Sequence, residues 1–446
     1  MSKTDNLILH TTHFSKMIKW SAHDSVSGEI GHHYPLILLS KVLKRVKEPV
    51  NIEDDQCYKR ITVRLYGKGV LQRDKLQGKY IGTKRQFAAH AGQFIISRID
   101  ARNGAFGIVP DSLEGAIVTN DFWVFEVHMA LPEYLMLVLS SDLFQKYWQT
   151  QSSGTTNRQR INEDDFLHSK IILPSIPEQA ALLEKYHTIM GKADRADKMS
   201  DKILMGFSKY LKKTLDISYI SITKKNVLNL VKFKNLSRWD PVHLSNKVEI
   251  KSKYPMTTIS KVINNFLIDN DGNSLRRNTK NESEILYQYI GMEDIEKNTG
   301  LRNVREVFGN EILSQTFCVP PGYIIYGKLR PYLNKYWVNT MNTKNLICSS
   351  EFFVFNTKNI NRDYFMAVLT SDIIQKQLPP LYSGARMPRI TEKDFLGLQI
   401  PLPPEDVQIE IGKRSAKTRT AINDLRNKAE KMRSFARSEF DDAVFR

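Results

Sequence analysis

A stretch of twenty residues near the middle of the chain occurs a second time near its end. The sequence RINEDDFLHSKIILPSIPEQ at residues 160–179 aligns without a gap to RITEKDFLGLQIPLPPEDVQ at residues 389–408. Upstream of this joint motif the match continues after one residue of slippage, with SSDLFQKYW from Ser140 beside TSDIIQKQL from Thr370. A repeat of about 230 residues is far too long for a solenoid. The 446-residue chain is therefore a duplicated domain.

Each copy has the same internal order. It opens with segments rich in β-branched and aromatic residues and broken by glycine, which predict strands and loops. A short apolar helix and the joint motif follow, and the apolar run inside the motif predicts a last strand. The chain then continues from Glu178 to Leu215 without a proline, which predicts one long helix, and the second copy repeats this pattern to the C-terminus. The expected organisation is a globular domain at 1–177, a long helix at 178–216, a second globular domain at 217–403 and a second long helix at 404–446.

Both predicted long helices carry a heptad seam, with apolar and small residues spaced alternately by four and three. The first seam comprises Leu182, Tyr186, Ile189, Ala193, Ala196, Ser200, Ile203, Phe207 and Tyr210, and the second comprises Ile411, Ser415, Thr418, Ile422, Leu425, Ala429, Met432 and Ala436. One seam needs another to bury it, so we expect the helices to pair antiparallel within the chain; the alternative is that each packs on its own globular domain. The predicted fold class is α+β: two similar α/β domains, joined and followed by two long antiparallel coiled-coil helices with an internal pseudo-two-fold.

The charge of the chain favours a polyanionic partner. Lys and Arg total 65 against 48 Asp and Glu, which gives a net charge of +17 and a pI of about 9.5. Nucleic acid is therefore the first expectation. The apolar runs are far shorter than the ~20 residues that a membrane-spanning helix needs. With no signal-peptide layout at the start and only Cys57, Cys318 and Cys348 as cysteines, we expect a cytoplasmic protein without a disulfide framework.

The order of domain, joint motif and long helix, written twice, resembles the specificity subunit of Type I restriction-modification enzymes over nearly the whole chain. The resemblance implies that the globular halves are target recognition domains, each reading one half of a split double-stranded DNA site. It implies that the helices set the separation of the halves and dock methyltransferase subunits, in two copies, alongside a restriction and translocation subunit. S-adenosylmethionine, Mg²⁺ and ATP would then belong to partners that methylate adenine or cut DNA, with no cofactor in this chain. The second joint departs from the usual glutamate-glutamine pair, which bears only on how that helix starts.

The sequence offers no catalytic motif, which favours a binder over an enzyme. A methyltransferase should carry a glycine-rich cofactor loop and an Asn- or Asp-Pro-Pro-Tyr tetrapeptide, and the PPLY at Pro379 lacks the leading residue. The segment PDSLEG from Pro110 lacks the lysine that a nuclease would need after Glu114, so we expect a turn there. A GxxxxGK[ST] phosphate loop does not occur. His32 and His33 have no ligand partners at metal spacing, so no metal site is expected.

Base reading in DNA grooves favours Arg, Lys, Asn and Gln on loops or helix ends. The candidate DNA-binding residues are Lys68, Arg73, Arg98, Arg102, Asn103, Arg158 and Arg160 in the first half, and Arg276, Arg277, Lys328, Arg330, Tyr332, Asn334, Arg386 and Arg389 in the second. Arg98 and Lys328 occupy equivalent positions in the repeat, as do Arg160 and Arg389. Equivalent residues on halves that read different sequences are better suited to phosphate than to bases. The strands DFWVF and EFFVF are expected to be core.

Apolar residues outside the seam give the long helices a surface for a partner. These candidates are Leu183, Met190, Met199, Leu204, Phe435 and Phe440. Such apolar faces would distinguish a subunit of a larger complex from a stand-alone duplicated DNA-binding regulator, because the regulator needs no enzyme partner. A further alternative is the specificity subunit of a system whose methyltransferase and nuclease share one partner chain, which only the neighbouring subunit would distinguish. An enzyme would require a cofactor or metal site that the sequence does not offer.

Overall fold

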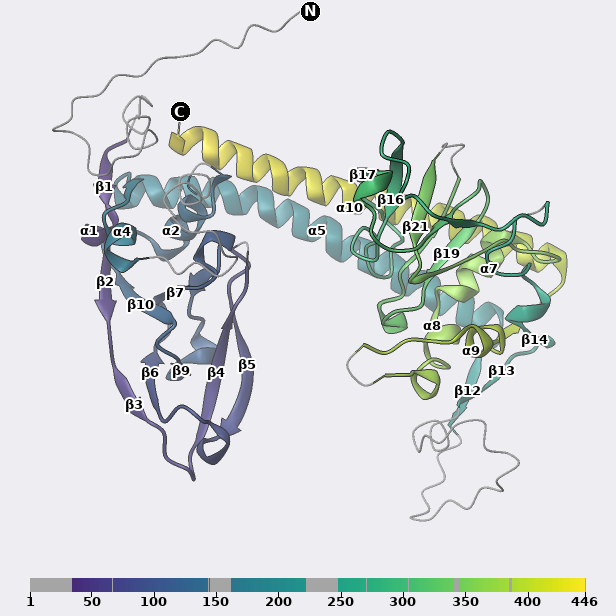
Figure 1. The fold of residues 1–446 in the computed structure, drawn as a ribbon, viewed down its shortest axis with the longest axis horizontal. Helices are drawn as coiled ribbons and strands as arrows, with labels where there is room; N and C mark the ends of the chain where they lie inside the picture. The colour runs from purple at the N-terminus through teal and green to yellow at the C-terminus, as the bar shows by residue number, and fades with distance from the viewer. Residues whose placement is uncertain are drawn as a thin grey trace, which may run out of the picture. The chain divides into compact units, whose positions relative to one another are not determined.

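The computed structural model describes residues 34–65, 67–142, 144, 162–221, 248–269, 271–303, 305–340, 345–384 and 387–445 (Figure 1). The chain divides into two compact units. The first unit comprises Met1–Ala193 with Glu430–Arg446, and the second comprises Asp194–Ala429. Each unit therefore contains one globular half together with part of both long helices.

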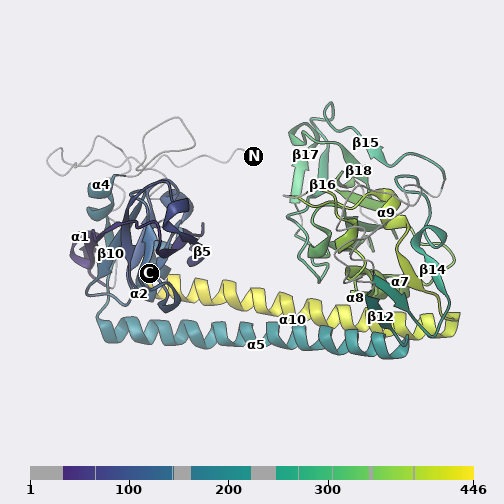
Figure 2. The same cartoon turned by 90° about the horizontal axis from the view of Figure 1, so that it is seen from below.

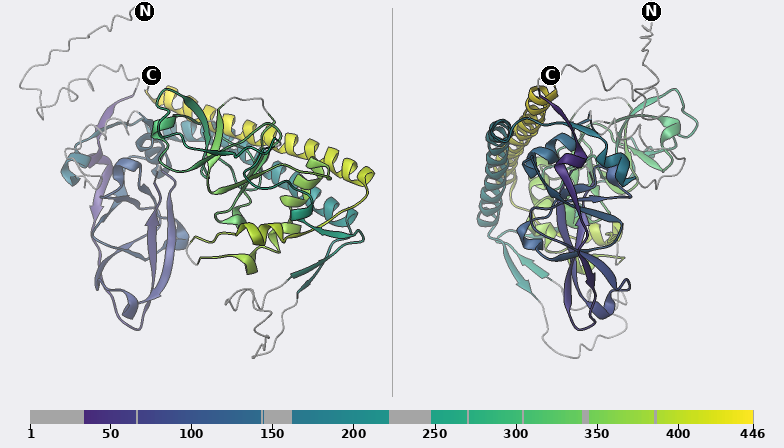
Figure 3. Two further views of the ribbon diagram at one scale, coloured as in Figure 1. Left: turned by 45° about the vertical axis from the view of Figure 1, so that its right-hand side comes forward. Right: turned by 90° about the vertical axis from the view of Figure 1, so that its left-hand side faces the viewer.

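The first unit contains two main sheets. The five-stranded sheet has the order β3 (Pro49–Asn51), β6 (Arg85–Ala89), β9 (Ala116–Val118), β4 (Cys57–Val63) and β5 (Val70–Gln77), with β9 and β4 parallel and the other neighbours antiparallel. The antiparallel four-stranded sheet has the order β2 (Leu43–Val46), β10 (Phe122–Val127), β7 (Phe94–Ser97) and β8 (Phe106–Ile108). These strands face the viewer in the right-hand view of Figure 3.

The second unit repeats most of this plan, but its second sheet has three strands where that of the first unit has four. Its five-stranded sheet has the order β15 (Arg276–Arg277), β18 (Thr316–Cys318), β21 (Leu346–Ser349), β16 (Leu286–Ile290) and β17 (Arg305–Phe308), again with one parallel pair, β21 with β16. A three-stranded sheet follows the order β20 (Tyr336–Val338), β19 (Ile324–Gly327) and β22 (Phe352–Phe355). The strands β12 (Ser218–Ser221) and β13 (Val248–Lys251) form a separate antiparallel pair. The shared order confirms the duplication that the joint motif predicts.

The aromatic strands form the centre of each domain, as predicted. Trp123 and Phe125 of β10 are buried, and every side chain of β22 from Phe352 to Phe355 is buried. Phe166 and Phe395, the phenylalanines of the two joint motifs, are fully buried against these strands. Aromatic side chains supply the largest buried area per residue, so these strands anchor the two cores.

Each joint motif folds into a one-turn helix followed by a strand. The acidic segment of the motif is α4 (Glu163–Leu167) in the first unit and α9 (Glu392–Leu396) in the second, and Asn162 and Thr391 cap the first turn by accepting a backbone N–H. The strands that follow, β11 (Lys170–Ile172) and β23 (Gln399–Pro401), pair with β1 (Leu36–Leu38) and β14 (Met256–Thr258). The predicted last strand of each half is therefore confirmed.

A buried glutamine at the end of each joint motif fastens the long helix to the globular domain. Gln179 accepts a hydrogen bond from the Leu131 N–H at 2.7 Å and donates to the carbonyl oxygens of Pro174 at 2.8 Å and Met129 at 3.2 Å. Gln408 is its equivalent and makes the same contacts with the Asn361 N–H, at 2.9 Å, and the Pro403 carbonyl, at 2.8 Å. Leu131 and Asn361 precede the short helices α2 (Pro132–Leu139) and α7 (Arg362–Leu369), so one side chain joins three segments.

A tyrosine in each short helix adds a second fastening. The Tyr134 hydroxyl donates to the Ile172 carbonyl at 3.0 Å, and the Tyr364 hydroxyl donates to the Pro401 carbonyl at 2.7 Å. The remaining helices are α1 (Leu39–Val42) and α8 (Asp372–Gln375). These matched contacts explain why the joint motif occurs twice.

The long helices are α5 (Ile176–Thr214, 39 residues) and α10 (Glu405–Phe445, 41 residues), as Figure 2 shows. They begin within two residues of the predicted positions 178 and 404. Their starts differ as the departure in the second joint suggests. The Ser175 N–H and hydroxyl both donate to the Glu178 carboxylate, at 2.9 and 2.6 Å, whereas proline occupies the equivalent position 404.

The two helices run antiparallel in each unit, as predicted. In the first unit, Phe440 near the end of α10 lies 6.1 Å from Tyr186 near the start of α5, measured between ring centroids. In the second unit, the Tyr210 hydroxyl near the end of α5 donates to Glu410 near the start of α10 at 3.0 Å. No predicted seam residue is exposed.

Arg426 of α10 binds the facing turn of α5 in the second unit. Its guanidinium donates to the Asp197 carboxylate at 3.0 Å, the Ser200 hydroxyl at 3.0 Å and the Asp201 carboxylate at 2.5 Å. Asp197 and Arg426 are equivalent positions of the two repeats, 229 residues apart. A contact between equivalent positions is what an antiparallel pair of repeated helices produces at its midpoint.

Candidate nucleic-acid interface

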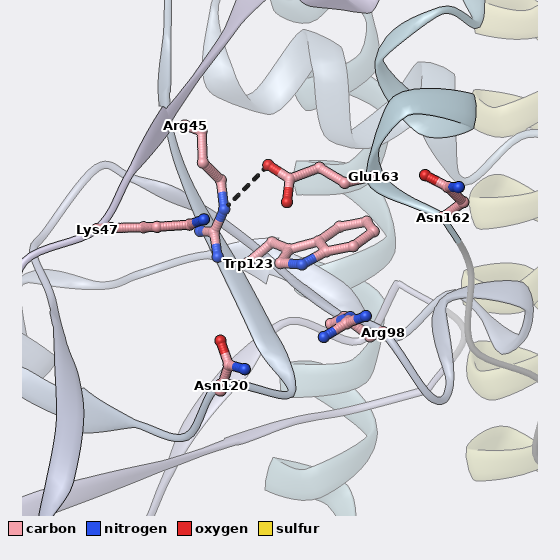
Figure 4. Close-up of a pocket in the computed structure, with 7 residues that line it drawn as sticks. All are labelled: Arg45, Lys47, Arg98, Asn120, Trp123, Asn162 and Glu163. Atoms are coloured by element: carbon pink, nitrogen blue, oxygen red, sulfur yellow. Dashed lines mark ion pairs between the residues drawn. The ribbon is translucent and has the colours of Figure 1, made fainter.

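A polar pocket of about 510 Å³ opens on the first unit beside the joint motif. We call it the basic pocket, and Figure 4 shows the residues that line it. They are Arg45, Lys47, Arg98, Asn120, Trp123, Asn162 and Glu163.

The ends of four elements bring these residues together. Arg45 belongs to β2 and Lys47 follows two residues later, so the alternation of an extended strand places both on the same side. Arg98 directly follows β7, and Trp123 lies in the neighbouring strand β10. Asn162 and Glu163 contribute the first turn of α4. The pocket therefore depends on the same joint motif that fastens the long helix.

Arg45 is fixed in place against the strands β2 and β10. Its Nε lies 3.2 Å from the Glu163 carboxylate, and its Nη1 donates to the carbonyl oxygens of Val124 at 2.8 Å and Val46 at 3.1 Å. Burial lowers the pKa of Arg45, the Glu163 carboxylate opposes this shift, and the positive charge of Arg98 adds to it. An arginine stays protonated in proteins, so Arg45 contributes a poorly hydrated positive charge.

Arg98 and Lys47 contribute the cations that face the opening. The Arg98 guanidinium lies 5.3 Å from the centre of the Trp123 ring, below it in the view of Figure 4. The Arg98 Nε is buried and has no hydrogen-bond partner among the residues that the structure describes. Lys47 and Asn120 are exposed. Three cations thus surround one carboxylate, which suits an anionic ligand such as a phosphate.

The equivalent place in the second unit is filled by aromatic rings. Phe353 stands where the first unit has Trp123, and Phe266 stacks on it with ring centroids 4.9 Å apart. Phe266 also lies 5.7 Å from Phe355, the position beside which the first unit places Arg45. Phe395 contacts all three rings. This aromatic cluster belongs to the hydrophobic core of the second unit.

Lys328, the equivalent of Arg98, is engaged inside the protein. Its Nζ donates to the Ser350 carbonyl at 2.9 Å and lies 5.1 and 5.4 Å from the rings of Phe353 and Phe317. Burial lowers the pKa of Lys328. A lysine that is held in this way is poorly placed to grip a phosphate without first releasing a carbonyl.

The other predicted DNA-binding residues of the first unit lie on two surface segments. Lys68 and Arg73 are exposed on the β4–β5 hairpin, with the Arg73 Nε 3.7 Å from Asp74. Arg102 and Asn103 lie in the single 3₁₀ turn Ala101–Asn103, where Asn103 is exposed. Arg158 and Arg160 lie outside the described residues, as do Arg386 of the second unit and the pair His32 and His33.

In the second unit, several predicted residues already have partners. Arg277 pairs with Glu282 at 2.6 Å, while its neighbour Arg276 is exposed. Arg389 forms a two-pronged ion pair with Glu351, at 3.1 and 2.8 Å, and this contact raises the pKa of Arg389. The charge of Arg389 is therefore largely neutralised within the unit.

Three residues near η9 (Pro331–Leu333) differ in their accessibility. Arg330 is exposed and Tyr332 is half exposed. Asn334 is buried and donates to the Thr370 carbonyl at 2.8 Å, with a left-handed backbone at φ 48°. The prediction of a base contact by Asn334 is corrected, because its amide supports the fold from inside.

The predicted partner surface of the long helices is smaller than the sequence suggested. Leu183 and Phe440 are buried, because they pack with Tyr134 and α2 in the core of the first unit, so their prediction as partner contacts is wrong. Met190 and Leu204 are half buried. Met199 and Phe435 are exposed at 53% and 55%. Met205, which is not one of the predicted partner residues, is exposed at 60%.

The basic pocket itself was only partly anticipated. Arg98 was predicted, whereas Arg45, Lys47, Asn120 and Glu163 were not. The repeat did contain a signal for this pocket. Trp123 and Arg98 both differ from their equivalents in the second half, although the segments around them match. Positions that change between copies while their surroundings stay constant are candidates for different ligands.

The described residues hold no cluster of three or more His, Cys, Asp or Glu side chains with metal-binding geometry. The segment PDSLEG contains the 3₁₀ turn Asp111–Leu113, which confirms the predicted turn. In the part of the chain that is described, every helix is too short or too polar to cross a bilayer.

Two regions of the chain, residues 44–192 and 245–430, match the family of the Type I restriction modification DNA specificity domain. Over 93 residues the chain is 30% identical to the Type I restriction enzyme EcoDI specificity subunit of Escherichia coli. This match covers 21% of the chain and spans about a fifth, 20%, of the length of that relative.

Solved structures with long coverage are also similar. The HsdS subunit from Thermoanaerobacter tengcongensis matches at 16% identity and a TM-score of 0.38, covering 94% of this chain and 99% of that one. The Type-I restriction-modification system S subunit from M. genitalium matches at 12% identity and a TM-score of 0.42, covering 93% and 96%. A chain from a study of assembly and conformational transition of the type I R-M system matches at 14% identity and a TM-score of 0.44, covering 93% and 98%.

Proposed function

The chain belongs to the family of Type I restriction modification DNA specificity domains, and we propose that it is the DNA-recognition subunit of such a complex. Each globular domain reads one half of a split double-stranded DNA target. The observation that carries this proposal is the repeated strand order of the two units, each followed by a long helix that starts from the same joint. Two equivalent readers on one chain suit a target in two parts.

The charge and the exposed cations of the units support DNA as the ligand. The net charge is +17, and the first unit presents Lys47, Lys68 and Arg73 at its surface. Neutralising phosphates with such residues releases counterions and provides most of the affinity for any DNA sequence. Specificity then comes from side chains that reach base edges.

The long helices set the distance between the readers and dock the catalytic partners. An unbroken helix of the length of α5, 39 residues, extends over roughly 58 Å at about 1.5 Å per residue. Met199, Met205 and Phe435 leave apolar area on the outer faces of the helices. Exposed apolar side chains on a charged helix suit a protein partner, and we assign this surface to methyltransferase subunits, one for each half.

Catalysis belongs to the partners in this proposal. S-adenosylmethionine, Mg²⁺ and ATP bind to the methyltransferase and to a restriction and translocation subunit. A stand-alone DNA-binding regulator is the alternative, and it would have no use for the exposed apolar helix faces. A partner in which both catalytic activities share one chain would dock in the same way, so only identifying that partner separates these two cases.

Lengthening both helices tests the proposed spacing. Four residues inserted after Ala193 and four after Ala429 add about 6 Å to each helix and leave the Arg426 contacts with Asp197, Ser200 and Asp201 undisturbed. Since duplex DNA rises about 3.4 Å per base pair, the gap between half-sites should grow by one or two base pairs. Mapping of methylated adenines after co-expression with the partner subunits measures this gap. Unchanged gaps, or altered half-sites, would contradict the role of the helices.

A further inference from the structure

The basic pocket holds more positive charge than the protein itself compensates. Glu163 is engaged by Arg45, whose side chain is only 16% exposed. Lys47 and Arg98 form no ion pair with the described residues. Like charges held close together in a poorly hydrated site repel one another, so an anion between them would be stabilised by all three cations.

The donors of the pocket differ in what they can offer a ligand. Both terminal nitrogens of Arg45 point to strand carbonyls, at 2.8 to 3.4 Å, so this residue acts as a fixed charge. Arg98 is held against the face of the buried Trp123 ring with its Nε enclosed, and its two terminal nitrogens have no hydrogen-bond partner among the described residues. The edge of a guanidinium donates two parallel hydrogen bonds to phosphate oxygens, which makes Arg98 the directional donor.

The position and openness of the pocket favour an anion that is part of a larger chain. Lys47 and Asn120 are exposed at its rim, so a ligand can extend out of the pocket into solvent. Each linkage of duplex DNA presents a singly charged phosphate on the outside of the helix. Such a group fits a site that offers one two-pronged donor, one mobile cation and a fixed charge behind them.

The second unit lacks this site. Phe266 and Phe353 stack where the first unit has Arg45 and Trp123, and Lys328 donates to a carbonyl instead of facing an opening. From these contrasts we infer that the basic pocket of the first unit binds one phosphodiester of the DNA backbone and that the second unit has no equivalent phosphate site. This inference rests on the proposed function, since it names a ligand of the first target recognition domain.

Charge-matched variants test the inference in the full chain assembled with its methyltransferase subunits. Arg98→Gln and Lys47→Gln should each weaken binding of the target duplex several-fold and lower the slope of log affinity against log salt by about one. Lys44→Gln is the control, because Lys44 is exposed on β2 beside Arg45 but does not line the pocket. Glu163→Gln should act in the opposite direction and tighten binding several-fold, since it removes the negative charge from the pocket.

Replacing single phosphates by uncharged methylphosphonates locates the contact. Wild-type complex should lose affinity strongly at one linkage in one half-site, and Arg98→Gln should be insensitive to that replacement. Inorganic phosphate at millimolar concentration should compete weakly, because a free ion lacks the other DNA contacts. Equal responses of Arg98→Gln, Lys47→Gln and Lys44→Gln in the salt titration would overturn the inference. The inference would also be overturned if the pocket variants failed to assemble with the methyltransferase subunits while the salt slope of DNA binding stayed unchanged. The pocket would then bind an acidic segment of a protein partner.

These experiments distinguish a failure of the proposed function from a failure of the phosphate site alone. If the wild-type complex binds its target no better than a scrambled duplex of equal length, the proposed function itself is wrong. If it discriminates but the pocket variants behave like Lys44→Gln, only the phosphate site is wrong. Equal unfolding midpoints of wild type and the exposed-site variant Lys47→Gln ensure that either result reports on binding.

Discussion

The place between the joint motif and the central sheet is built in opposite ways in the two units. In the first unit it holds Arg45, Arg98 and Glu163 around an opening, and in the second it holds Phe266, Phe353 and Phe395 in contact. The strands beside both places pair in the same way, β10 with β7 in the first unit and β22 with β19 in the second. The joints keep the duplicated frame, while side chains one layer away differ between an open basic pocket and a closed aromatic core.

The aromatic cluster should be the more costly of the two to disturb. Phe395→Ala removes a fully buried ring with four ring neighbours, Phe266, Tyr326, Phe353 and Phe355, and should lower the free energy of unfolding by about 3–5 kcal/mol. Phe166→Ala removes the equivalent ring, which lies against Trp123 at the edge of an open pocket, so neighbouring side chains can relax and the cost should be nearer the lower end.

Chemical denaturation followed by hydrogen exchange in each unit measures both losses. Phe435→Ala provides the control, because the same side chain is removed from an exposed position and should change stability by less than about 0.5 kcal/mol. A larger loss of unfolding free energy from Phe166→Ala than from Phe395→Ala would contradict the prediction that the aromatic cluster is the more costly to disturb.

The two joints should differ in strength according to their hydrogen bonds. Gln179→Ala leaves the Leu131 N–H and two carbonyl groups without their partner, and Gln408→Ala leaves one N–H and one carbonyl. Buried polar groups that lose a partner cost about 1–3 kcal/mol each, so both variants should be destabilised by a few kcal/mol and Gln179→Ala by more. Unfolding midpoints provide the measurement, with the exposed Gln72→Ala as the control. Equal midpoints for Gln179→Ala and Gln72→Ala would show that the joint does not depend on this side chain.

Breaking the Arg389 ion pair should give the second unit a free cation for DNA phosphate, as the first unit already has. Glu351→Gln releases the guanidinium of Arg389, so binding to any DNA sequence should tighten several-fold and the salt slope should rise by about one. Glu306→Gln makes the same change of charge at an exposed position on β17. Anisotropy titrations with a non-target duplex compare the two. An equal gain from Glu306→Gln would attribute the effect to net charge alone.

The smallest expected difference between the units is in their response to pH. Hydrogen bonds to Glu114 and then to Glu48 raise the pKa of His90 in the first unit, whereas the second unit has Pro320 at the equivalent position. Because the folded pKa lies above the unfolded one, the stabilisation is complete below about pH 6.5 and is lost as pH rises through the folded pKa. His90→Gln should therefore destabilise the first unit at about pH 6 by less than about 1 kcal/mol, since the site is exposed, and have less effect at about pH 8.5.

Hydrogen exchange resolved by unit, at both pH values, provides the measurement for His90→Gln. The second unit should respond equally to pH in wild type and variant. A destabilisation that is the same at both pH values would show that His90 acts by packing and not by its charge.

The sequence predicted the parts of the fold that depend on pattern. The spacing of Ala193, Ser200 and Ile411 predicted the helix pairing, and the match of Phe166 with Phe395 predicted the two joints. It did not predict that Leu183 and Phe440 would be buried by α2, because the heptad describes only the seam and not what covers the flanks of a helix.

The candidate site was harder to predict for a physical reason. Arg45, Arg98 and Glu163 come from strands and a helix that are distant in the chain, and each alone is an ordinary surface charge. Asn334 carried the right chemistry for a base but lies inside the domain. Residue type alone cannot separate these cases, because burial is decided by which strands become neighbours.

The contact between Asp197 and Arg426 has a consequence for the history of the chain. If a fragment with one domain and one helix paired with its own copy through this surface, the same contact would join Asp197 to Asp197 or Arg426 to Arg426. Like charges at that distance repel, and the Ser200 hydroxyl and Asp201 carboxylate that receive Arg426 would face no guanidinium in a pair of first helices. After duplication the two copies have become complementary instead of identical. Loss of the second half of the gene would therefore leave a protein whose first helices cannot rebuild this contact by self-association.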